Sequence, residues 1–243
     1  MNLHKTEIEN NLKSETQILE AINHKGFLFD LIIYITVMFL IREVYFEEVH
    51  FLVNGLFWSF STLIIATWRM KVRNISWKDL GLRKPKNIKK TLLVSVGILI
   101  ATVLSIVLFN IIKDSLPFLT EPETSGVNSS SKFGELKGNW LLFITIMPMV
   151  LVESFLEELL DRGFLMNWIE KLFSSTSFAT VIAVVLQAAI FGFRHSNDLS
   201  GRSITVGLIG LVMGIAYVKF GRNLWPLIIA HCLLNTMSMI GRV

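Results

Sequence analysis

A run of 22 residues without a charged side chain decides the fold class of this chain: Thr91–Ile112, TLLVSVGILIATVLSIVLFNII. A helix of about 20 apolar residues is long enough to cross the hydrocarbon core of a bilayer, which is roughly 30 Å thick. Six more apolar stretches flank this run, namely Phe27–Ile41, Phe51–Trp68, Trp140 to about Leu160, Phe178–Phe193, Ile204–Val218 and Leu224–Ile240. The sequence therefore predicts an all-α fold, a polytopic transmembrane helix bundle of about seven spans within a range of six to eight.

The composition of the 243-residue chain agrees with a membrane protein. Apolar residues make up 52% and charged residues only 17% of the sequence, whereas a soluble domain is roughly 45–50% apolar and about 25% charged. This shift excludes intrinsic disorder and most classes of cytosolic enzyme. The single cysteine, Cys232, excludes an intrachain disulfide and a CxxC metal or redox motif.

The segment 1–26 is polar and mixed in charge, and it lacks the basic start, short apolar core and cleavage site of a signal peptide. We expect a retained N-terminal tail, followed over 27–139 by N-terminal transmembrane helices and loops. The Arg69–Lys90 loop carries nine basic residues against one acid, Asp79. Short basic loops stay in the cytoplasm, so we expect a multi-pass protein of the bacterial plasma membrane with a cytoplasmic N-terminus. Membrane topology explains this loop more simply than nucleic-acid binding does, so we expect the lipid bilayer as a partner and no nucleic acid.

Ionisable side chains inside an apolar span are costly and are functional candidates by default. The stretch Glu153–Gly163, ESFLEELLDRG, holds four acids and one base. Glu153, Glu157 and Asp161 are four residues apart and share one helix face. Glu158 and Arg162 have the same spacing on the adjacent face, where they can form an ion pair. One carboxylate would then be neutralised while Glu157 acts as a general base; the alternative is a solvated helix end at the membrane surface.

Two histidines lie in later spans. His195 ends the stretch Phe191–His195, and His231 is followed four residues later by Asn235 on the same helix face. The alternative for His195 is an ordinary residue at the membrane interface. The alternative for His231 and Asn235 is a hydrogen bond between helices that only stabilises the bundle. Counted from the turn at Ser174–Ser177, Glu157 and His195 are both about 28 Å away, at similar depth. His231 is only about 10 residues past the turn before Trp225, so a tilted span, a recessed turn or a break near Pro226 is needed to bring it level.

In order, the motifs Glu157-Glu158-x-x-x-Arg162, Phe191-x-x-x-His195 and His231-x-x-x-Asn235 resemble the CPBP family. These are membrane proteases that process CAAX proteins and bacteriocins, also called Abi or CAAX prenyl protease 2-type. The resemblance covers about Trp140 to Asn235 and implies that 140–243 is the catalytic core, with the motif-bearing helices forming an intramembrane cavity. Position 161 is usually hydrophobic or aromatic in the family. Asp161 is a departure that would raise the pKa of Glu157 or compete for Arg162.

The resemblance implies an intramembrane endopeptidase that hydrolyses a peptide bond of a membrane-associated peptide or protein, such as a CAAX-type protein or a pheromone or bacteriocin precursor. Glu157 would act as general base on a water, helped by His195, while His231 and Asn235 would donate to the oxyanion. Glu158 and Arg162 would orient the site. We expect no cofactor; the alternative is a zinc enzyme with Glu157, His195 and His231 as ligands.

Two other kinds of protein fit the same residues. One is a non-catalytic membrane protein of the same fold that acts as a scaffold or in bacteriocin self-immunity. The other is a transporter that uses the buried acids, although the sequence has no evident inverted repeat. The expected partner of a protease is a peptide or membrane-protein substrate, and the sequence leaves the oligomeric state open.

Overall fold

The computed structural model describes residues 24–115, 133, 135–196 and 200–243. Within these ranges the chain is helical and contains no strand. The first helix, His24–Glu43, ends in a 3-10 turn, η1 (Ile41–Glu43). The elements that follow are α2 (Phe51–Val72), α3 (Ile88–Ile112), η2 (Lys113–Ser115), α4 (Trp140–Glu157), η5 (Glu158–Leu165), α5 (Met166–Leu172), α6 (Ala179–Ser196), α7 (Gly201–Lys219) and α8 (Trp225–Ile240). The all-α prediction is confirmed.

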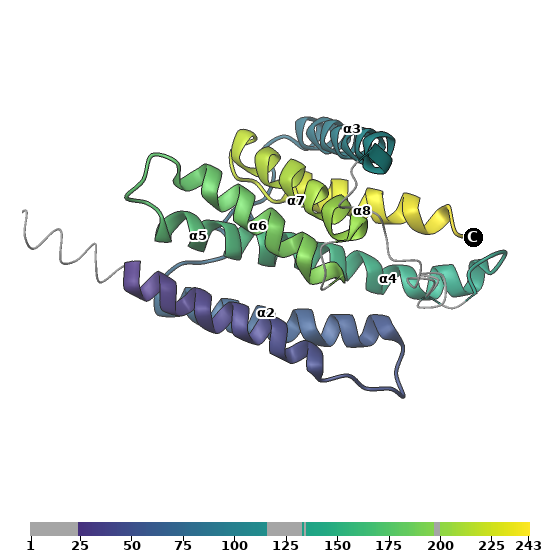
Figure 1. Cartoon of the computed structure of the whole chain (residues 1–243), viewed down its shortest axis with the longest axis horizontal. Helices are drawn as coiled ribbons and strands as arrows, with labels where there is room; N and C mark the ends of the chain where they lie inside the picture. Colours follow the sequence, from purple (N-terminus) through teal and green to yellow (C-terminus); the bar gives the residue numbers. More distant parts are fainter. Residues whose placement is uncertain (1–23, 116–132, 134, 197–199) are drawn as a thin grey trace, which may run out of the picture.

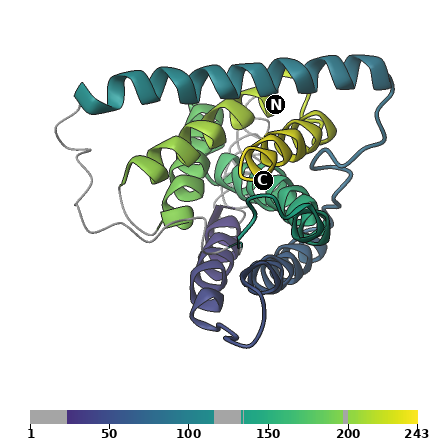
Figure 2. The same ribbon diagram turned by 90° about the vertical axis from the view of Figure 1, so that its right-hand side faces the viewer.

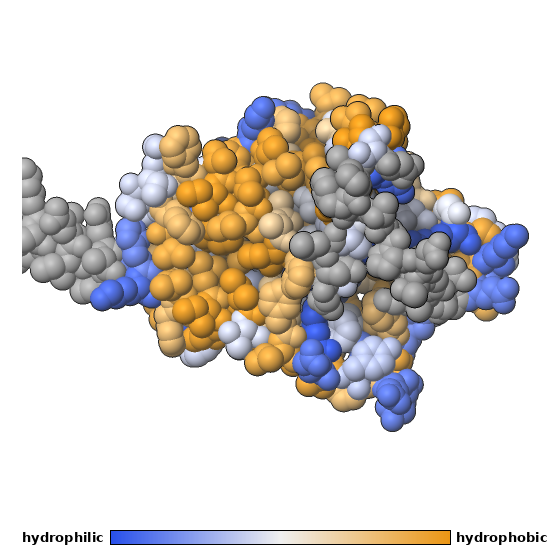
Figure 3. Space-filling model, viewed as in Figure 1, coloured by the Kyte–Doolittle hydropathy of each residue, from blue (hydrophilic) through white to orange (hydrophobic). Residues whose placement is uncertain are grey.

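Six of the helical segments in the described residues are long and apolar enough to cross a membrane, and α8 is apolar but only 16 residues long. The protein is an integral, multi-pass membrane protein. Large apolar side chains such as Phe29, Ile32, Val181 and Val185 are exposed. Figure 3 shows a broad hydrophobic surface over the first helix and α6, as expected of a face that contacts lipid.

The predicted fourth span does not end near Leu160. α4, η5 and α5 form one continuous helix, Trp140–Leu172, and η5 in its middle is π-helical. Glu158, Asp161 and Arg162 are fully buried in this segment, so the interpretation of the charged stretch as a solvated helix end is wrong. The helix continues because partners inside the bundle neutralise these charges. Single π-helical turns within α-helices are frequent at functional sites.

Most helices run along the long axis of the molecule, whereas α3 lies transverse to them across α7 and α8 (Figures 1 and 2). The buried side chains of α3 recur every three or four residues, as on one face of a helix: Thr91, Ser95, Ile98 and Thr102. The Ser95 and Thr102 hydroxyls donate to backbone carbonyls of their own helix at 2.8 Å. Phe109 is also buried, and much of the remaining surface of α3 is exposed and apolar, including Leu93, Leu104 and Ile111.

α6 and α7 are in close contact at Gly192. A Cβ on Gly192 would lie only 2.4 Å from the carbonyl oxygen of Ser203 and 3.0 Å from Gly207. Small residues let helix backbones approach in a membrane bundle. This contact fixes the end of α6 that carries His195.

The turn between α7 and α8 is recessed into the protein. Leu224 is fully buried, and its N–H donates to the Gly81 carbonyl at 3.1 Å. Its side chain lies against Gly163 of η5. From there, Glu157 is six residues away along one helix and His231 seven along the other, about 9 and 10 Å at 1.5 Å per residue. The recessed turn is what brings His231 to the depth of Glu157.

A buried ion cluster ties the first helix to α2 and α5. The fully buried Asp30 accepts hydrogen bonds from Arg69 Nε (2.7 Å), Arg73 Nε and Trp168 Nε1 (3.0 Å). Two of the nine cations assigned to the basic loop are therefore paired inside the bundle. Because Asp30 lies 39 residues before Arg69, no local pattern in the sequence pointed to this cluster.

Candidate active site

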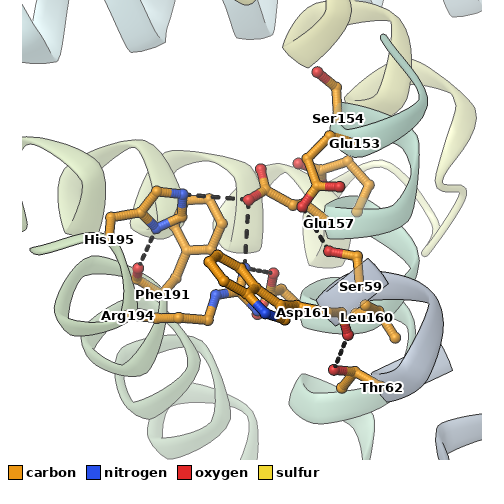
Figure 4. A network of polar contacts seen from close by, with 12 residues as sticks. Ser59, Thr62, Glu153, Ser154, Glu157, Leu160, Asp161, Phe191, Arg194 and His195 are labelled. Atoms are coloured by element: carbon orange, nitrogen blue, oxygen red, sulfur yellow. Dashed lines mark hydrogen bonds and ion pairs between the residues drawn. The ribbon is translucent and has the colours of Figure 1, made fainter. Parts of the chain in front are cut away.

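Three helical segments bring the predicted site residues together, and Figure 4 shows two of these residues, Glu157 and His195. The α4–η5 helix supplies Glu157, Glu158 and Arg162, α6 supplies His195, and α8 supplies His231 and Asn235. Glu157 and His231 are 8% and 4% exposed, and Glu158 and Arg162 are fully buried. The group therefore lies inside the helix bundle.

Glu157 is the carboxylate at which the motifs meet. Its Oε1 lies 3.2 Å from His195 Nε2 and 3.5 Å from Arg194 Nη2, and its Oε2 lies 3.5 Å from His231 Nε2. Figure 4 shows the His195 ring and the Arg194 guanidinium approaching the same side of this carboxylate. Two imidazoles from different helices thus flank Glu157.

Glu158 contacts two side chains, Arg162 and His231. Arg162 Nη1 donates to its Oε1 at 3.1 Å, and His231 Nδ1 lies 2.7 Å from the same oxygen. The ion pair expected from the spacing of Glu158 and Arg162 is present. His231 therefore bridges the two neighbouring glutamates, with one ring nitrogen toward each.

The contacts of the two histidines indicate which of their ring nitrogens carry hydrogen. A backbone carbonyl can only accept, so His195 Nδ1, 2.7 Å from the Phe191 carbonyl, carries a hydrogen. Its Nε2 is left to face Glu157. His231 contacts a carboxylate through each nitrogen, and this suits the doubly protonated imidazolium, which has two donors.

Asp161 does not compete for Arg162 as the sequence suggested. It binds Arg194, whose Nη2 lies 2.8 Å from Asp161 Oδ2 and also contacts Glu157. Spacing along the helix of Asp161 pointed only to Arg162, whereas the ion-pair partner of Asp161 comes from α6. Arg42, at the end of the first helix, donates to the Arg194 carbonyl at 2.6 Å.

Asn235 contacts neither glutamate. Its Nδ2 donates to Ser154 Oγ at 2.8 Å, and the Ser154 hydroxyl donates to the Val150 carbonyl. The contact joins α8 to α4 one turn away from Glu157. The amide retains a second N–H, because Nδ2 carries two hydrogens.

The sequence interpretation missed Arg194 and Arg42. The position of Arg194 beside His195, at the end of an apolar span, was a signal that could have identified it. Glu153 also lies near this group and accepts a hydrogen bond from Ser59 of α2 at 2.5 Å. Nothing in the spacing of the sequence connects Ser59 or Arg42 to the motifs.

Glu157, His195 and His231 form the alternative zinc-ligand set. Within the described ranges, no group of three or more His, Cys, Asp or Glu side chains is arranged to hold a metal ion. Glu157 lies in direct polar contact with His195 and His231, the other two residues of the alternative zinc set. His231 Nδ1 is bound to Glu158.

A family model described as type II CAAX prenyl endopeptidase, Rce1-like, matches residues 139–237. The chain matches no curated protein and no solved structure. The matched region runs from the N-cap of α4 into α8. It therefore contains every motif residue whose geometry is given above, and it agrees with the CPBP resemblance. Residues 139–237 of this chain are thus similar to the Rce1-like type II CAAX prenyl endopeptidases.

Proposed function

We propose that this protein is an intramembrane endopeptidase in which Glu157 activates a water to hydrolyse a peptide bond. The observation that carries the proposal is the position of Glu157 between His195 Nε2 and His231 Nε2, at 3.2 and 3.5 Å. A general base must sit where the proton that it takes can be passed on. Three helices hold this carboxylate and its two imidazole neighbours inside the bundle.

In the proposed reaction, Glu157 takes a proton from the water, and the resulting hydroxide attacks the scissile carbonyl carbon. The tetrahedral intermediate carries a negative charge on the former carbonyl oxygen, and donors aimed at that oxygen stabilise it. His231 Nε2 and the free N–H of Asn235 supply these donors. Collapse of the intermediate breaks the C–N bond, and the proton held by Glu157 passes to the leaving amine.

Four further residues position the reacting groups. The Glu158–Arg162 pair binds His231 Nδ1 and fixes the ring orientation. Arg194 holds Glu157 from the side opposite to His231. Asp161 forms an ion pair with the same guanidinium of Arg194. Arg194 and Asp161 are positioning residues in this proposal.

The buried site and the family match support a membrane-associated substrate. A site inside a membrane bundle suits a peptide or protein that is itself membrane-associated. A CAAX-type protein, a pheromone precursor or a bacteriocin precursor would meet this condition. We place the protein in the bacterial plasma membrane with its N-terminus in the cytoplasm, since the basic loop favours that orientation.

The test compares peptide termini in membranes of host cells that carry the wild type, Glu157→Gln or Glu170→Gln at matched expression. Glu170→Gln is the control, because Glu170 is bound to Arg222 at 2.6 Å, apart from the motif residues. We expect termini to disappear with Glu157→Gln alone. Unchanged termini, in cells that still differ from a deletion strain, would favour the immunity or scaffold alternative.

A metal chelator should leave the cleavage rate of the purified enzyme unchanged, because Glu157 activates the water in this proposal. Loss of activity on chelation, with recovery on adding Zn²⁺, would instead establish the zinc alternative.

A further inference from the structure

A basic pocket lies away from the proposed active site, at the end of the bundle where α3 and α8 begin and α7 ends. Its volume is about 540 Å³. Five of the side chains that line it are basic and none is acidic; the basic ones are Arg83, Lys84, Lys86, Lys90 and Lys219.

These five cations make no ion pair within the described residues, unlike other basic residues nearby. Arg69 is paired with Asp30, and Arg222 with Glu170 at 2.6 Å. Asp79 is close enough to be attracted to Arg83, but its carboxylate accepts hydrogen bonds from Ser76 and does not line the pocket. The pocket therefore carries a concentrated positive charge that the chain does not neutralise.

The positive-inside rule accounts for basic residues in a cytoplasmic loop, but it does not require them to converge. Here Lys219 comes from the end of α7, more than 120 positions after the loop lysines, and shares one hollow with them. The first turn of α3, whose N-cap Asn87 accepts from the Lys90 N–H at 3.0 Å, also borders it. Helix N-termini add further positive potential.

The walls of the pocket combine two chemistries. Val94, Phe220 and Pro226 give it an apolar side next to the basic one, and Phe220 is exposed. The pocket also lies at one end of the bundle, where α3 and α8 begin and α7 ends. An amphiphile with an anionic headgroup and an acyl chain matches both walls. Basic pockets between transmembrane helices are known to bind lipid phosphates.

We propose that this pocket binds the phosphate headgroup of an anionic membrane phospholipid. The lysines contact the phosphate, and the apolar wall contacts the start of an acyl chain. Inorganic phosphate shares the headgroup chemistry and lacks the chain. The proposal is independent of the peptidase activity, because none of the lining residues belongs to the active site.

The experiment measures binding of short-chain phosphatidylglycerol to the detergent-solubilised full chain. The pocket variant is the triple substitution Lys86→Gln, Lys90→Gln and Lys219→Gln. The matched control removes the same charge from the same end of the bundle through Lys71→Gln, Lys78→Gln and Lys89→Gln, none of which lines the pocket. A lysine near an anionic lipid surface contributes roughly five-fold to affinity, so the pocket variant should lose on the order of 100-fold.

The control variant should retain most of the affinity, and short-chain phosphatidylcholine should bind weakly to every variant. An equal loss in both triple variants would overturn the proposal, because it would show diffuse attraction and no pocket. Inorganic phosphate that binds as tightly as the lipid would also overturn it, because the apolar wall would then contribute nothing. Thermal unfolding of each variant establishes that it is folded before binding is measured.

Discussion

Arg194 and Asp161 form a buried ion pair, and replacing one of them should lower the stability of the protein more than replacing the other. Removing one partner of a buried ion pair costs about 3–5 kcal/mol, because the other charge is left uncompensated. Arg194→Gln leaves Asp161 fully buried with no second ion-pair partner in the described part of the chain, so it should incur the full cost. Asp161→Asn leaves Arg194 with Glu157 at 3.5 Å, so it should cost only about half as much.

The double variant Asp161→Asn/Arg194→Gln separates a structural role from a positioning role. Removing both charges of a buried pair is often close to neutral, so stability should return to within about 1 kcal/mol of the wild type. Cleavage should stay reduced, because Glu157 has lost the guanidinium that holds it, and a misplacement of about 1 Å can cost roughly 100-fold in rate.

The assay pairs denaturant unfolding in detergent micelles with the rate of substrate cleavage for the wild type, both single variants and the double variant. Recovery of both stability and cleavage in the double variant would show that the pair only maintains the fold. A larger loss of stability from Asp161→Asn than from Arg194→Gln would refute the reasoning on buried charge itself.

Three further changes test other parts of the structure. Asp30→Asn removes the ion-pair partner of the buried Arg69 and should lower the free energy of unfolding by about 3–5 kcal/mol in denaturant titrations. Gly192→Ala should cost about 1–3 kcal/mol through overpacking between α6 and α7, whereas Gly97→Ala, with open space around its Cβ, should unfold at the wild-type denaturant concentration. Ser154→Ala frees the Asn235 amide and should lower kcat more than it raises KM in steady-state assays, and an unchanged kcat would contradict the proposed oxyanion role.

The helices were predictable because membrane spans have a strong local signal. All seven predicted stretches are helical, with boundaries that shift by a few residues except at the fourth. That span runs on to Leu172 because its charges are neutralised by residues from α6 and α8. Spacing along one helix identifies Arg162 as a partner for Glu158, but it cannot identify a partner from another helix. The same reason accounts for the missed contacts of Asp161.

The depth of His231 shows a second limit of counting residues along a helix. Counting assumes that every turn lies at the membrane surface, and the turn before α8 does not. The recessed position of this turn depends on Gly81, whose φ of +102° lies in the left-handed region that favours glycine. A Cβ there would lie 2.1 Å from the Arg222 carbonyl oxygen. A contact between residues 141 positions apart thus sets the level of a proposed active-site histidine.

The charges around the site explain why Glu157, among its acidic neighbours, is the proposed base. Glu158 is bound to Arg162, and Asp161 to Arg194 at 2.8 Å. A guanidinium stays protonated in proteins, so these two carboxylates have permanent counter-ions. The nearest contact of Glu157 is instead the imidazole of His195, at 3.2 Å. Asp161 makes the shorter contact with Arg194, 2.8 Å against 3.5 Å for Glu157, so Glu157 is surrounded by the two histidines and a longer contact with Arg194.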